Sequence, residues 1–374
     1  MPAPASRALV PGVLRRSLDA ARFLRASGLL ARPGLLVARL RARRTMATLD
    51  RLLLEHRGAL ALLLAHEVGV FDALERRPLT AQGLAAERGL RPRAAEALLR
   101  ILESEALVER HGERYRLPEG SRTLLVRGGE LSVAPLLELM SAQVAAFTDV
   151  VRGLRTGEVP PSLDIFSPGA RSAAFLDAVN EHLYWAAADL LARVSLPPVH
   201  SAIVGSMGVG FSARLLERAP GARITYGCLE HLIREVPRLR RRYGVPDDAV
   251  AGEHAHGGDP LADRWGDEDF DLVMLTKKMV LRPEDRVGES FARKAFQVLR
   301  PGGVAIFWES VHPVDGPTPP MRAMEALMDL VASPDGRVNV EDELARLLER
   351  IGYQDVQVVA CLGDRTTFVV ARKG

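Results

Sequence analysis

The stretch Ala202-Ile203-Val204-Gly205-Ser206-Met207-Gly208-Val209-Gly210-Phe211 decides the fold of this chain. A short apolar strand runs into a glycine-rich turn, and a helix over Phe211–Arg218 follows. Glycine lets the backbone bend sharply and approach a bound molecule closely, so that its N–H groups can face a ligand. Any tight turn from a strand to a helix favours glycine, so the turn alone indicates a fold class rather than a function.

Strands and helices alternate on both sides of this turn. Helices predicted over about 285–299 and 340–351 separate the strands, which indicates an α/β fold with a Rossmann-like, doubly wound sheet. We assign this domain to residues 196–374. Besides the strand before the turn, the predicted strands are 224–226, 270–275, 304–308, 356–360 and 366–371. The last two predict a C-terminal antiparallel hairpin.

The segment before this domain, residues 47–125, has a mostly helical pattern. A leucine-rich helix begins near Leu49, a short helix follows with Thr80 as its N-cap, and a third helix runs over Pro92–Glu105. Two short strands then flank a turn at His111-Gly112. Helix, turn, helix and hairpin in this order predict a winged helix.

A winged helix either binds DNA or serves as a dimerisation module. Arg91, Arg93 and Arg100 favour DNA, yet glutamates lie in the same stretch and leave no basic face. We therefore expect no nucleic-acid partner and favour dimerisation. A winged-helix regulator with a ligand-sensing domain is the non-enzymatic alternative.

Residues 126–195 are predicted to be linking helices. The segment Phe175–Trp185 carries aromatic and polar side chains on one helix. It either walls a substrate pocket or packs between the domains, and both interpretations stay open. In the first, Phe175, His182 and Tyr184 face the substrate.

The charge of the chain is concentrated at its N-terminus. The 374 residues have a net charge of +3 and a pI near 9.1. Residues 1–44 contain ten arginines and one aspartate, a net charge of +9, which leaves −6 for the other 330 residues. The body is thus mildly acidic, and its charge gives no support for nucleic-acid binding.

The basic extension, residues 1–46, has three interpretations. Arginines interleave with leucines in residues 1–44, as in an amphipathic helix on a membrane surface. Alternatively the extension packs on a partner subunit, or it is poorly ordered and the body begins near Met46. No apolar run reaches the roughly 18 residues needed to cross a bilayer. The chain has only two cysteines, Cys228 and Cys361. The lack of a long apolar run and the low cysteine count together predict a cytoplasmic protein without disulfides.

Three motifs and the order of the elements carry a family resemblance. Leu154–Gly157, Leu299–Gly303 and Leu347–Tyr353 resemble the small-molecule class I methyltransferases of the caffeic-acid O-methyltransferase type. The resemblance covers about residues 47–374. Within the group, the chain is most similar to pigment enzymes such as the bacteriochlorophyllide C-20 methyltransferase. It implies a homodimeric enzyme that binds S-adenosylmethionine in the sheet domain and acts on a small molecule.

The resemblance places the cofactor beside the glycine-rich turn. The cofactor-binding residues that it implies are Gly205, Gly208, Gly210, Glu230 and Asp259. The family's first motif begins with an acid, where this chain has Ile203. The acid that accepts hydrogen bonds from the ribose hydroxyls is replaced by Cys228, and Glu230 two residues later is the candidate substitute.

The family's catalytic histidine is absent from this chain. That histidine accepts a proton from the substrate hydroxyl, and its position falls on Val280 or Arg282, depending on whether one residue is inserted. Arginine is a poor base because its pKa is above about 12. Glu309, directly after the strand predicted over 304–308, matches a family glutamate that holds the base. Arg282 and Glu309 are the candidate catalytic residues.

The segment after strand 270–275 is rich in cations. Lys277, Lys278 and Arg282 either bind an anionic group of the substrate or form a solvated loop that Glu284 and Asp285 neutralise. The candidate substrate-binding residues are Phe175, His182, Tyr184, Lys277, Met279, Met324 and Met328.

Two enzymatic functions remain. The first is S-adenosylmethionine-dependent methylation of a small secondary metabolite, either aromatic, polyketide-like or a pigment, by an in-line transfer that proximity and desolvation drive. The alternative is a methyltransferase fold redirected to cyclisation, rearrangement, decarboxylation or hydroxylation, which the changes at Ile203 and Cys228 favour. No metal site is predicted, because the histidines at ligand spacing, His254 and His256, are expected in an exposed glycine-rich loop.

Overall fold

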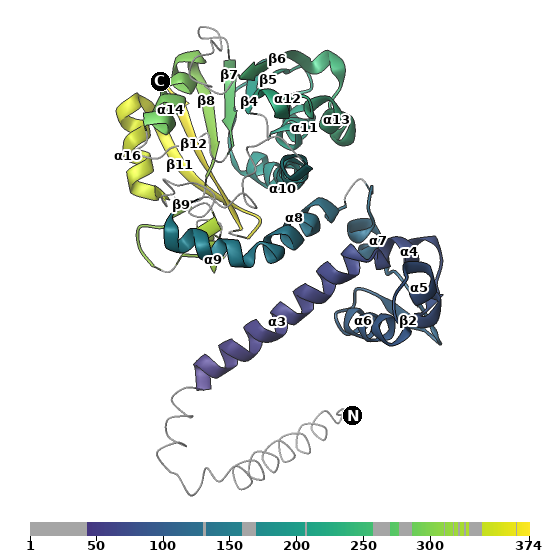
Figure 1. Cartoon of the computed structure of the whole chain (residues 1–374). Coiled ribbons are helices and arrows are strands. Elements are labelled where there is room, and N and C mark those ends of the chain that lie inside the picture. Colours follow the sequence, from purple (N-terminus) through teal and green to yellow (C-terminus); the bar gives the residue numbers. More distant parts are fainter. Residues whose placement is uncertain are drawn as a thin grey trace, which may run out of the picture.

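The computed structural model describes most of the chain after the basic extension. The described residues are 43–129, 132–158, 170–205, 208–256, 270–276, 286–309, 311–316, 318–320, 322–324, 327–328, 339–363 and 365–374. The expectations for the basic extension lie outside them, apart from residues 43–46. Figure 1 shows a helical N-terminal domain beside a larger sheet domain.

The N-terminal domain has the predicted winged-helix order. Its elements are α3 (Arg43–Glu67), α4 (Val70–Arg76), β1 (Leu79–Thr80), α5 (Ala81–Arg88), α6 (Pro92–Ser104), β2 (Glu109–His111), β3 (Arg114–Arg116) and α7 (Glu119–Leu125). Thr80 caps α5 as predicted, because its hydroxyl accepts a hydrogen bond from the Gly83 N–H at 3.0 Å. The strands are ordered β1-β3-β2, and the helices enclose a core with Phe71, Leu84 and Leu99.

Three helices follow: α8 (Ala134–Ala145), α9 (Phe147–Thr156) and α10 (Ala170–Arg193). In Figure 1, α8 and α9 run along one side of the sheet domain, and α3 extends out of the N-terminal domain. Helix α10 packs on the sheet, since Leu176, Leu183 and Leu190 are fully buried in the same core as the strands. The apolar face of Phe175–Trp185 is therefore a packing face, and a pocket would have to use its other faces.

The sheet has the predicted topology. Its seven strands are β4 (Ser201–Gly205), β5 (Arg223–Leu229), β6 (Val250–His256), β7 (Phe270–Leu275), β8 (Leu299–Trp308), β11 (Tyr353–Cys361) and β12 (Thr366–Lys373), in the order β11-β12-β8-β7-β4-β5-β6. The strands from β8 to β6 are parallel. Strand β12 is antiparallel to both β8 and β11, which confirms the C-terminal hairpin.

One strand contradicts the sequence interpretation. We expected an exposed loop at His254 and His256, but both belong to β6, which pairs in parallel with β5. Strand β6 lies at the edge of the sheet. Backbone pairing can hold an edge strand that lacks a continuous apolar pattern. Because Glu253 and the two histidines are polar, the sequence pattern did not predict a strand here.

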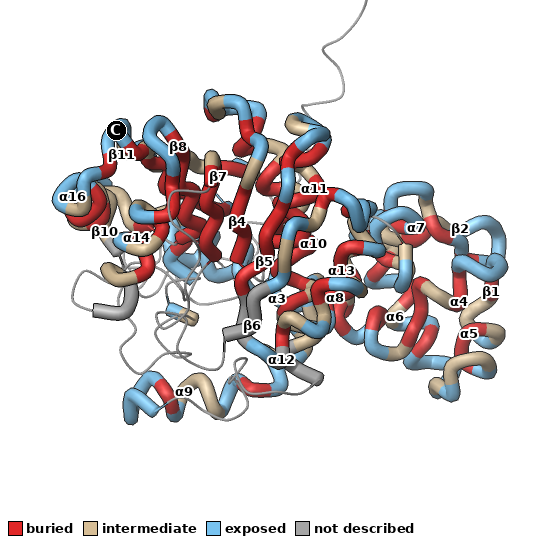
Figure 2. Tube along the Cα trace, turned by 90° about the horizontal axis from the view of Figure 1, so that it is seen from above, coloured by how far each residue is buried: buried red, intermediate tan, exposed pale blue. Residues whose placement is uncertain are grey.

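Helices cover both faces of the sheet. On one face α10, α11 (Val209–Arg218), α12 (Glu230–Ile233) and α13 (Val236–Tyr243) join the core around β4 and β5. On the other face α14 (Arg286–Val298) and α16 (Glu341–Ile351) pack around Phe291, Phe307 and Leu347. Figure 2 shows the buried strands between these more exposed helices. Two short strands, β9 (Val311–His312) and β10 (Asn339–Val340), pair beyond β8.

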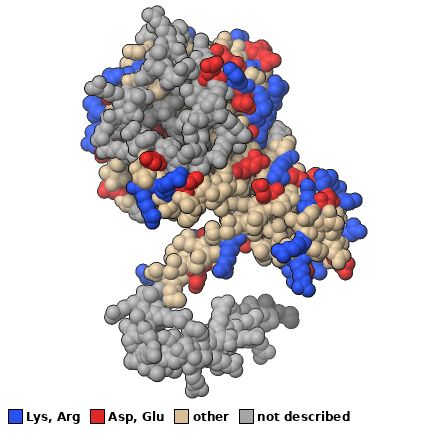
Figure 3. Space-filling model, in the orientation of Figure 1, with Lys and Arg blue, Asp and Glu red and all other residues tan. Residues whose placement is uncertain are grey.

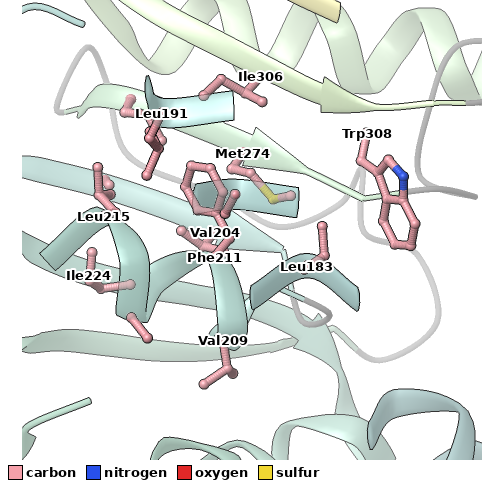
Figure 4. Packing of buried hydrophobic residues seen from close by; sticks show 14 of the residues in the cluster. Leu183, Leu191, Val204, Val209, Phe211, Leu215, Ile224, Met274, Ile306 and Trp308 are labelled. Carbon is pink, nitrogen blue, oxygen red and sulfur yellow. The ribbon is translucent and has the colours of Figure 1, made fainter. Parts of the chain in front are cut away.

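The glycine-rich turn lets α11 lie directly against α10. A Cβ on Gly210 would stand 2.2 Å from the backbone oxygen of Asn180. The Gly210 N–H donates to Asn180 Oδ1 at 2.9 Å, and Asn180 Nδ2 donates to the Leu176 carbonyl at 2.8 Å. Around this contact Leu183, Val209 and Phe211 pack together (Figure 4).

Gly210→Ala should therefore destabilise the protein by at least about 1–3 kcal/mol, because the added methyl group meets backbone atoms that cannot rotate away. Urea denaturation measures the free energy of unfolding. Gly221→Ala is the matched control, since a Cβ at Gly221 meets nothing within 4 Å. Equal stability of the two variants would contradict the close contact between α10 and α11.

Candidate functional site

The carboxyl ends of four parallel strands meet at one edge of the sheet. Strand β4 lies between β5 and β7, because the chain adds β5 and β6 on one side of β4 and then crosses back to β7 on the other side. Open α/β sheets bind ligands at such a reversal of strand order. Gly205 ends β4, Glu230 follows β5, Thr276 follows β7 and Glu309 follows β8. The fold thus brings Gly205, Glu230 and Glu309 to one edge, as the sequence interpretation requires.

The glycines of the turn have different structural roles. The Gly208 N–H donates to the Gly205 carbonyl at 2.8 Å, and a Cβ on Gly208 would lie 2.2 Å from Val204 Cγ1. Packing therefore requires glycine at 208, as it does at Gly210. A Cβ on Gly205 would meet only ordinary contacts, at 3.6 Å or more. Cofactor binding by these glycines stays a prediction, and Gly210 has its N–H engaged by Asn180.

Thr276 is the residue at this edge that the sequence interpretation missed. It is 0% exposed, and its Oγ1 atom has no hydrogen-bond partner among the described residues. This oxygen lies 3.8 Å from the position of a Cβ on Gly205. An unpartnered buried hydroxyl costs about 1–3 kcal/mol, so Thr276 Oγ1 is a candidate hydrogen-bonding group at this edge. The available signal was a polar residue directly after the apolar strand Phe270–Leu275.

Glu230 lies at the expected place after β5. It is the first residue of α12 and is exposed. Its carboxylate makes an ion pair with Arg234 at 3.4 Å, and both side chains are largely exposed. Because such a surface pair is weak, the carboxylate can exchange this partner for a ligand hydroxyl.

Three consecutive residues of α10 fix its position. Asn180 holds the N-terminus of α11, as described above. Glu181 is only 3% exposed, and its carboxylate accepts hydrogen bonds from Trp185 Nε1 at 3.0 Å, Arg242 Nη2 at 3.0 Å and the Tyr243 hydroxyl at 3.2 Å. The buried charge of Glu181 is thus paired and hydrogen-bonded, which ties α10 to α13.

His182, the third of these residues, reaches the end of β8. Its ring stacks on Trp308, with 5.5 Å between ring centroids and an interplanar angle of 22°. Trp308 is buried and donates from Nε1 to Thr366 Oγ1 at 2.8 Å. Glu309 comes next in the chain, is 7% exposed, and donates its N–H to the Thr367 carbonyl at 3.2 Å. The ring of His182, from α10, and the residue Glu309 therefore both lie at the carboxyl end of β8.

Tyr184 does not join this group. Its ring lies 5.3 Å from Tyr243, and the guanidinium of Arg214 lies 3.8 Å from its centroid. Two residues along a helix point about 200° apart, so Tyr184 faces α11 and α13 when His182 faces β8. Phe175 is half-buried against the same apolar core as the strands.

The remaining predicted site residues are only partly described. Met324 is exposed and Met328 is half-buried. Asp259, Lys277, Lys278, Met279, Val280, Arg282, Glu284 and Asp285 lie outside the described residues. Their predicted roles stay predictions.

The tyrosines near this edge stay protonated at neutral pH. Burial raises the pKa of Tyr226 to about 12. Burial, and then the charge of Glu181, raise the pKa of Tyr243 above its ordinary range. In contrast, burial and then the charge of Arg322 lower the pKa of His312, whose Nδ1 lies 3.1 Å from the Thr318 hydroxyl. His312 is therefore a neutral imidazole at neutral pH.

The described part of the chain contains neither a metal-ligand cluster nor a single helix that could cross a membrane. No group of three or more His, Cys, Asp or Glu residues there is arranged to hold a metal ion. No single described helix is long and apolar enough to cross a membrane, although α8 and α9, bent by 64°, pass the test of length and composition as a pair.

The N-terminal domain matches a known family. Residues 51–127 fit the family model of the O-methyltransferase dimerisation domain. This match agrees with the dimerisation interpretation of the winged helix, which we placed at residues 47–125.

Most of the chain is similar to small-molecule methyltransferases. The tetracenomycin polyketide synthesis 8-O-methyl transferase TcmO of Streptomyces glaucescens is 26% identical over 329 residues, 84% of this chain and 93% of that protein. Human N-acetylserotonin methyltransferase, solved with S-adenosylmethionine, has a TM-score of 0.75 at 20% identity, covering 88% of this chain and 98% of that one. The mitomycin 7-O-methyltransferase MmcR has a TM-score of 0.69 at 20% identity, covering 89% and 99%.

These likenesses confirm the family resemblance and the fold that the sequence indicated, and they support an enzyme of the methyltransferase family. The relatives are named for methyl transfer, so the non-methylating alternative finds no support among them. Another similar structure, PigF, holds S-adenosylhomocysteine. The finer likeness to bacteriochlorophyllide enzymes stays a prediction.

Glu181→Gln should destabilise the protein by about 1–3 kcal/mol, because it leaves the half-buried guanidinium of Arg242 without its counter-charge. The midpoint of urea denaturation measures the effect. Glu217→Gln is the control, since Glu217 pairs with Arg214 but is 58% exposed. An unchanged midpoint for Glu181→Gln would show that the buried carboxylate does not hold α10 in place.

Proposed function

We propose that this protein is a homodimeric, S-adenosylmethionine-dependent O-methyltransferase that acts on a hydroxyl group of a small secondary metabolite. The observation that carries this proposal is the buried, unpartnered Thr276 hydroxyl beside Gly205, at the carboxyl ends of β7 and β4. Relatives with the same fold hold S-adenosylmethionine or S-adenosylhomocysteine. A ligand atom at this edge would satisfy the hydroxyl that the described residues leave without a partner.

The residues at this edge fit S-adenosylmethionine. Glu230 would accept hydrogen bonds from the ribose hydroxyls, and the Thr276 hydroxyl would bond a polar atom of the ligand near Gly205. Helix α11 begins at Val209 with no side-chain cap, so its N-terminus suits the carboxylate of the methionine part. When bound, the cofactor supplies an electrophilic methyl group on a sulfonium.

The chain's own residues would orient the acceptor and exclude water. His182, stacked on the buried ring of Trp308, forms an aromatic surface, and Glu309 directly follows Trp308 in the chain. Helix α10 holds this surface in place through Asn180 and Glu181. A fixed surface of this kind lowers the entropy cost of bringing two reactants together, which is a large part of the barrier to methyl transfer.

The acceptor that we propose is an aromatic polyketide or pigment with a free hydroxyl. TcmO is named for a step in the synthesis of tetracenomycin, a polyketide, and it matches 84% of this chain. The stacked rings of His182 and Trp308 favour a flat aromatic acceptor, because offset stacking adds about 0.5–1.5 kcal/mol to the burial of ring area.

Isothermal titration calorimetry of the purified protein should detect S-adenosylmethionine binding in the micromolar to low millimolar range. Thr276→Val removes one hydrogen bond and should raise the dissociation constant about 3–12-fold. Because the valine side chain carries no hydroxyl that needs a partner, the ligand-free variant should be at least as stable as the wild type.

Loss of affinity with unchanged or raised stability separates a binding role of Thr276 from a structural role. Thr225→Val, in the middle of β5, is the control for a buried threonine far from the carboxyl edge. No binding by the wild-type protein at millimolar cofactor would end the proposal. Turnover of a metabolite without S-adenosylhomocysteine would revive the non-methylating alternative.

The homodimer that we propose uses the exposed apolar face of α3. Met46, Leu49 and Leu53 follow a helical spacing and are 36%, 52% and 56% exposed. In Figure 3 a mostly uncharged surface continues from α3 toward α8. Such a face on an isolated chain marks a protein contact, and this domain is of the dimerisation type.

Leu53→Glu should raise the dissociation constant of the dimer at least about tenfold, because it puts a charge into an apolar contact. Thr48→Glu adds the same charge about 140° around α3 from Leu53 and should leave the dimer intact. Light scattering after size-exclusion chromatography reports the mass of both variants. A monomeric wild type, or a fully dimeric Leu53→Glu variant, would contradict this interface.

A further inference from the structure

We propose that His182 is the base of this enzyme: it takes the proton from a phenolic hydroxyl of a flat, fused-ring acceptor that lies against the His182–Trp308 pair. The inference rests on the proposed function and adds to it a catalytic residue and a substrate class. It replaces the family's histidine, whose position this chain fills with Val280 or Arg282.

The stacking geometry places His182 where a base is needed. Its ring lies 5.5 Å from that of Trp308, on the last residue of β8, and Glu309 directly follows. The same carboxyl edge carries Gly205 and Thr276, beside which the cofactor is proposed to bind. A proton acceptor on α10 therefore faces the end of the sheet at which the methyl donor would be held.

Hydrogen bonds to neighbouring elements fix the helix that carries His182. Asn180 bonds the N-terminus of α11, and Glu181 accepts three hydrogen bonds from Trp185, Arg242 and Tyr243. Trp308, on which His182 stacks, is itself held by the Thr366 hydroxyl. Because neighbouring contacts fix both rings, the imidazole is preorganised for proton transfer rather than swinging freely.

Among the tyrosines and histidines described near this edge, two histidines are candidates for the base. The tyrosines Tyr226 and Tyr243 stay protonated, since burial raises the pKa of each. His312 is a neutral imidazole, but it lies beyond β8 on the short strand β9, beside Thr318 and Arg322. His182 instead stacks on the strand end itself, so the geometry favours it over His312.

The surface also indicates the acceptor. Trp308 is 5% exposed and is covered by the half-buried ring of His182, so the imidazole is the part of the pair that an acceptor can contact, with the buried indole and apolar core behind it. Aromatic rings pack on such a face by offset stacking. A hydroxylated fused-ring compound can stack there and present its hydroxyl to the imidazole edge.

The step balances with the proposed cofactor alone. The phenolic O–H bond breaks and its proton passes to Nε2 of His182. The phenolic oxygen forms a bond to the methyl carbon while the carbon–sulfur bond breaks, and that electron pair stays on sulfur, giving neutral S-adenosylhomocysteine. The imidazolium of His182 then releases its proton to water as the product leaves.

The test uses quinizarin and β-naphthol, two fused-ring phenols whose absorption moves to longer wavelength on ionisation. Wild-type dimer with S-adenosylmethionine should methylate at least one of them, measured as S-adenosylhomocysteine formed. His182→Phe keeps a ring against Trp308 but removes the base, so turnover should fall at least about 100-fold while acceptor affinity changes little. Calorimetry should show unchanged S-adenosylmethionine binding.

A second measurement does not depend on turnover. With S-adenosylhomocysteine bound, the wild-type protein should shift the absorption of the bound phenol toward that of the ionised form, and His182→Phe should not. His200→Asn, at an exposed histidine, is the control and should behave as wild type in both measurements.

Three results would overturn the inference while leaving the proposed function intact. His182→Phe could retain both turnover and the absorption shift; His312→Asn could lose turnover in its place; or the wild type could bind S-adenosylmethionine and methylate neither phenol. Failure of the wild type to bind S-adenosylmethionine at all would instead refute the proposed function, and this inference with it.

Discussion

The close crossing of α10 and α11 is the contact on which the carboxyl edge of the sheet depends. Gly210 has no side chain, so the two backbones touch, and Asn180 closes the contact with a hydrogen bond to the Gly210 N–H. The crossing sets where α11 begins after β4, and it sets which residues of α10 face the end of β8. The cofactor turn and the proposed acceptor wall are therefore two sides of one helix contact.

A buried carboxylate extends this constraint to the rest of the chain. Glu181 binds Arg242 of α13, and the same Arg242 nitrogen lies 3.4 Å from the Ser132 carbonyl, directly before α8. Removing a charge from water is costly, and the three hydrogen bonds to Glu181 offset that cost. The wall of the site is thus connected through α13 to the segment that leads from the dimerisation domain.

Much of the architecture could be predicted from local patterns. The Thr80 cap, the alternation of strands and helices, and the C-terminal hairpin follow from short-range rules, and the structure contains each of them. Strand β6 could not be predicted in this way, because pairing with β5 rather than apolar periodicity holds it. Thr276 was not predicted as a site residue, because a threonine after a strand is common in proteins. Only the order of the strands in the sheet places it beside Gly205.

The sequence by itself determined the fold class and the winged-helix module, and it recorded the absence of the family's histidine. These depend on spacing, on glycine, and on residue type along one chain. Only the tertiary structure decided which side chains of α10 contact the end of β8. His182 stacks on Trp308, whereas Tyr184, only two residues later, contacts Tyr243. The physical reason is that a helix turns about 100° per residue, so neighbours in sequence meet different elements, and only packing decides which.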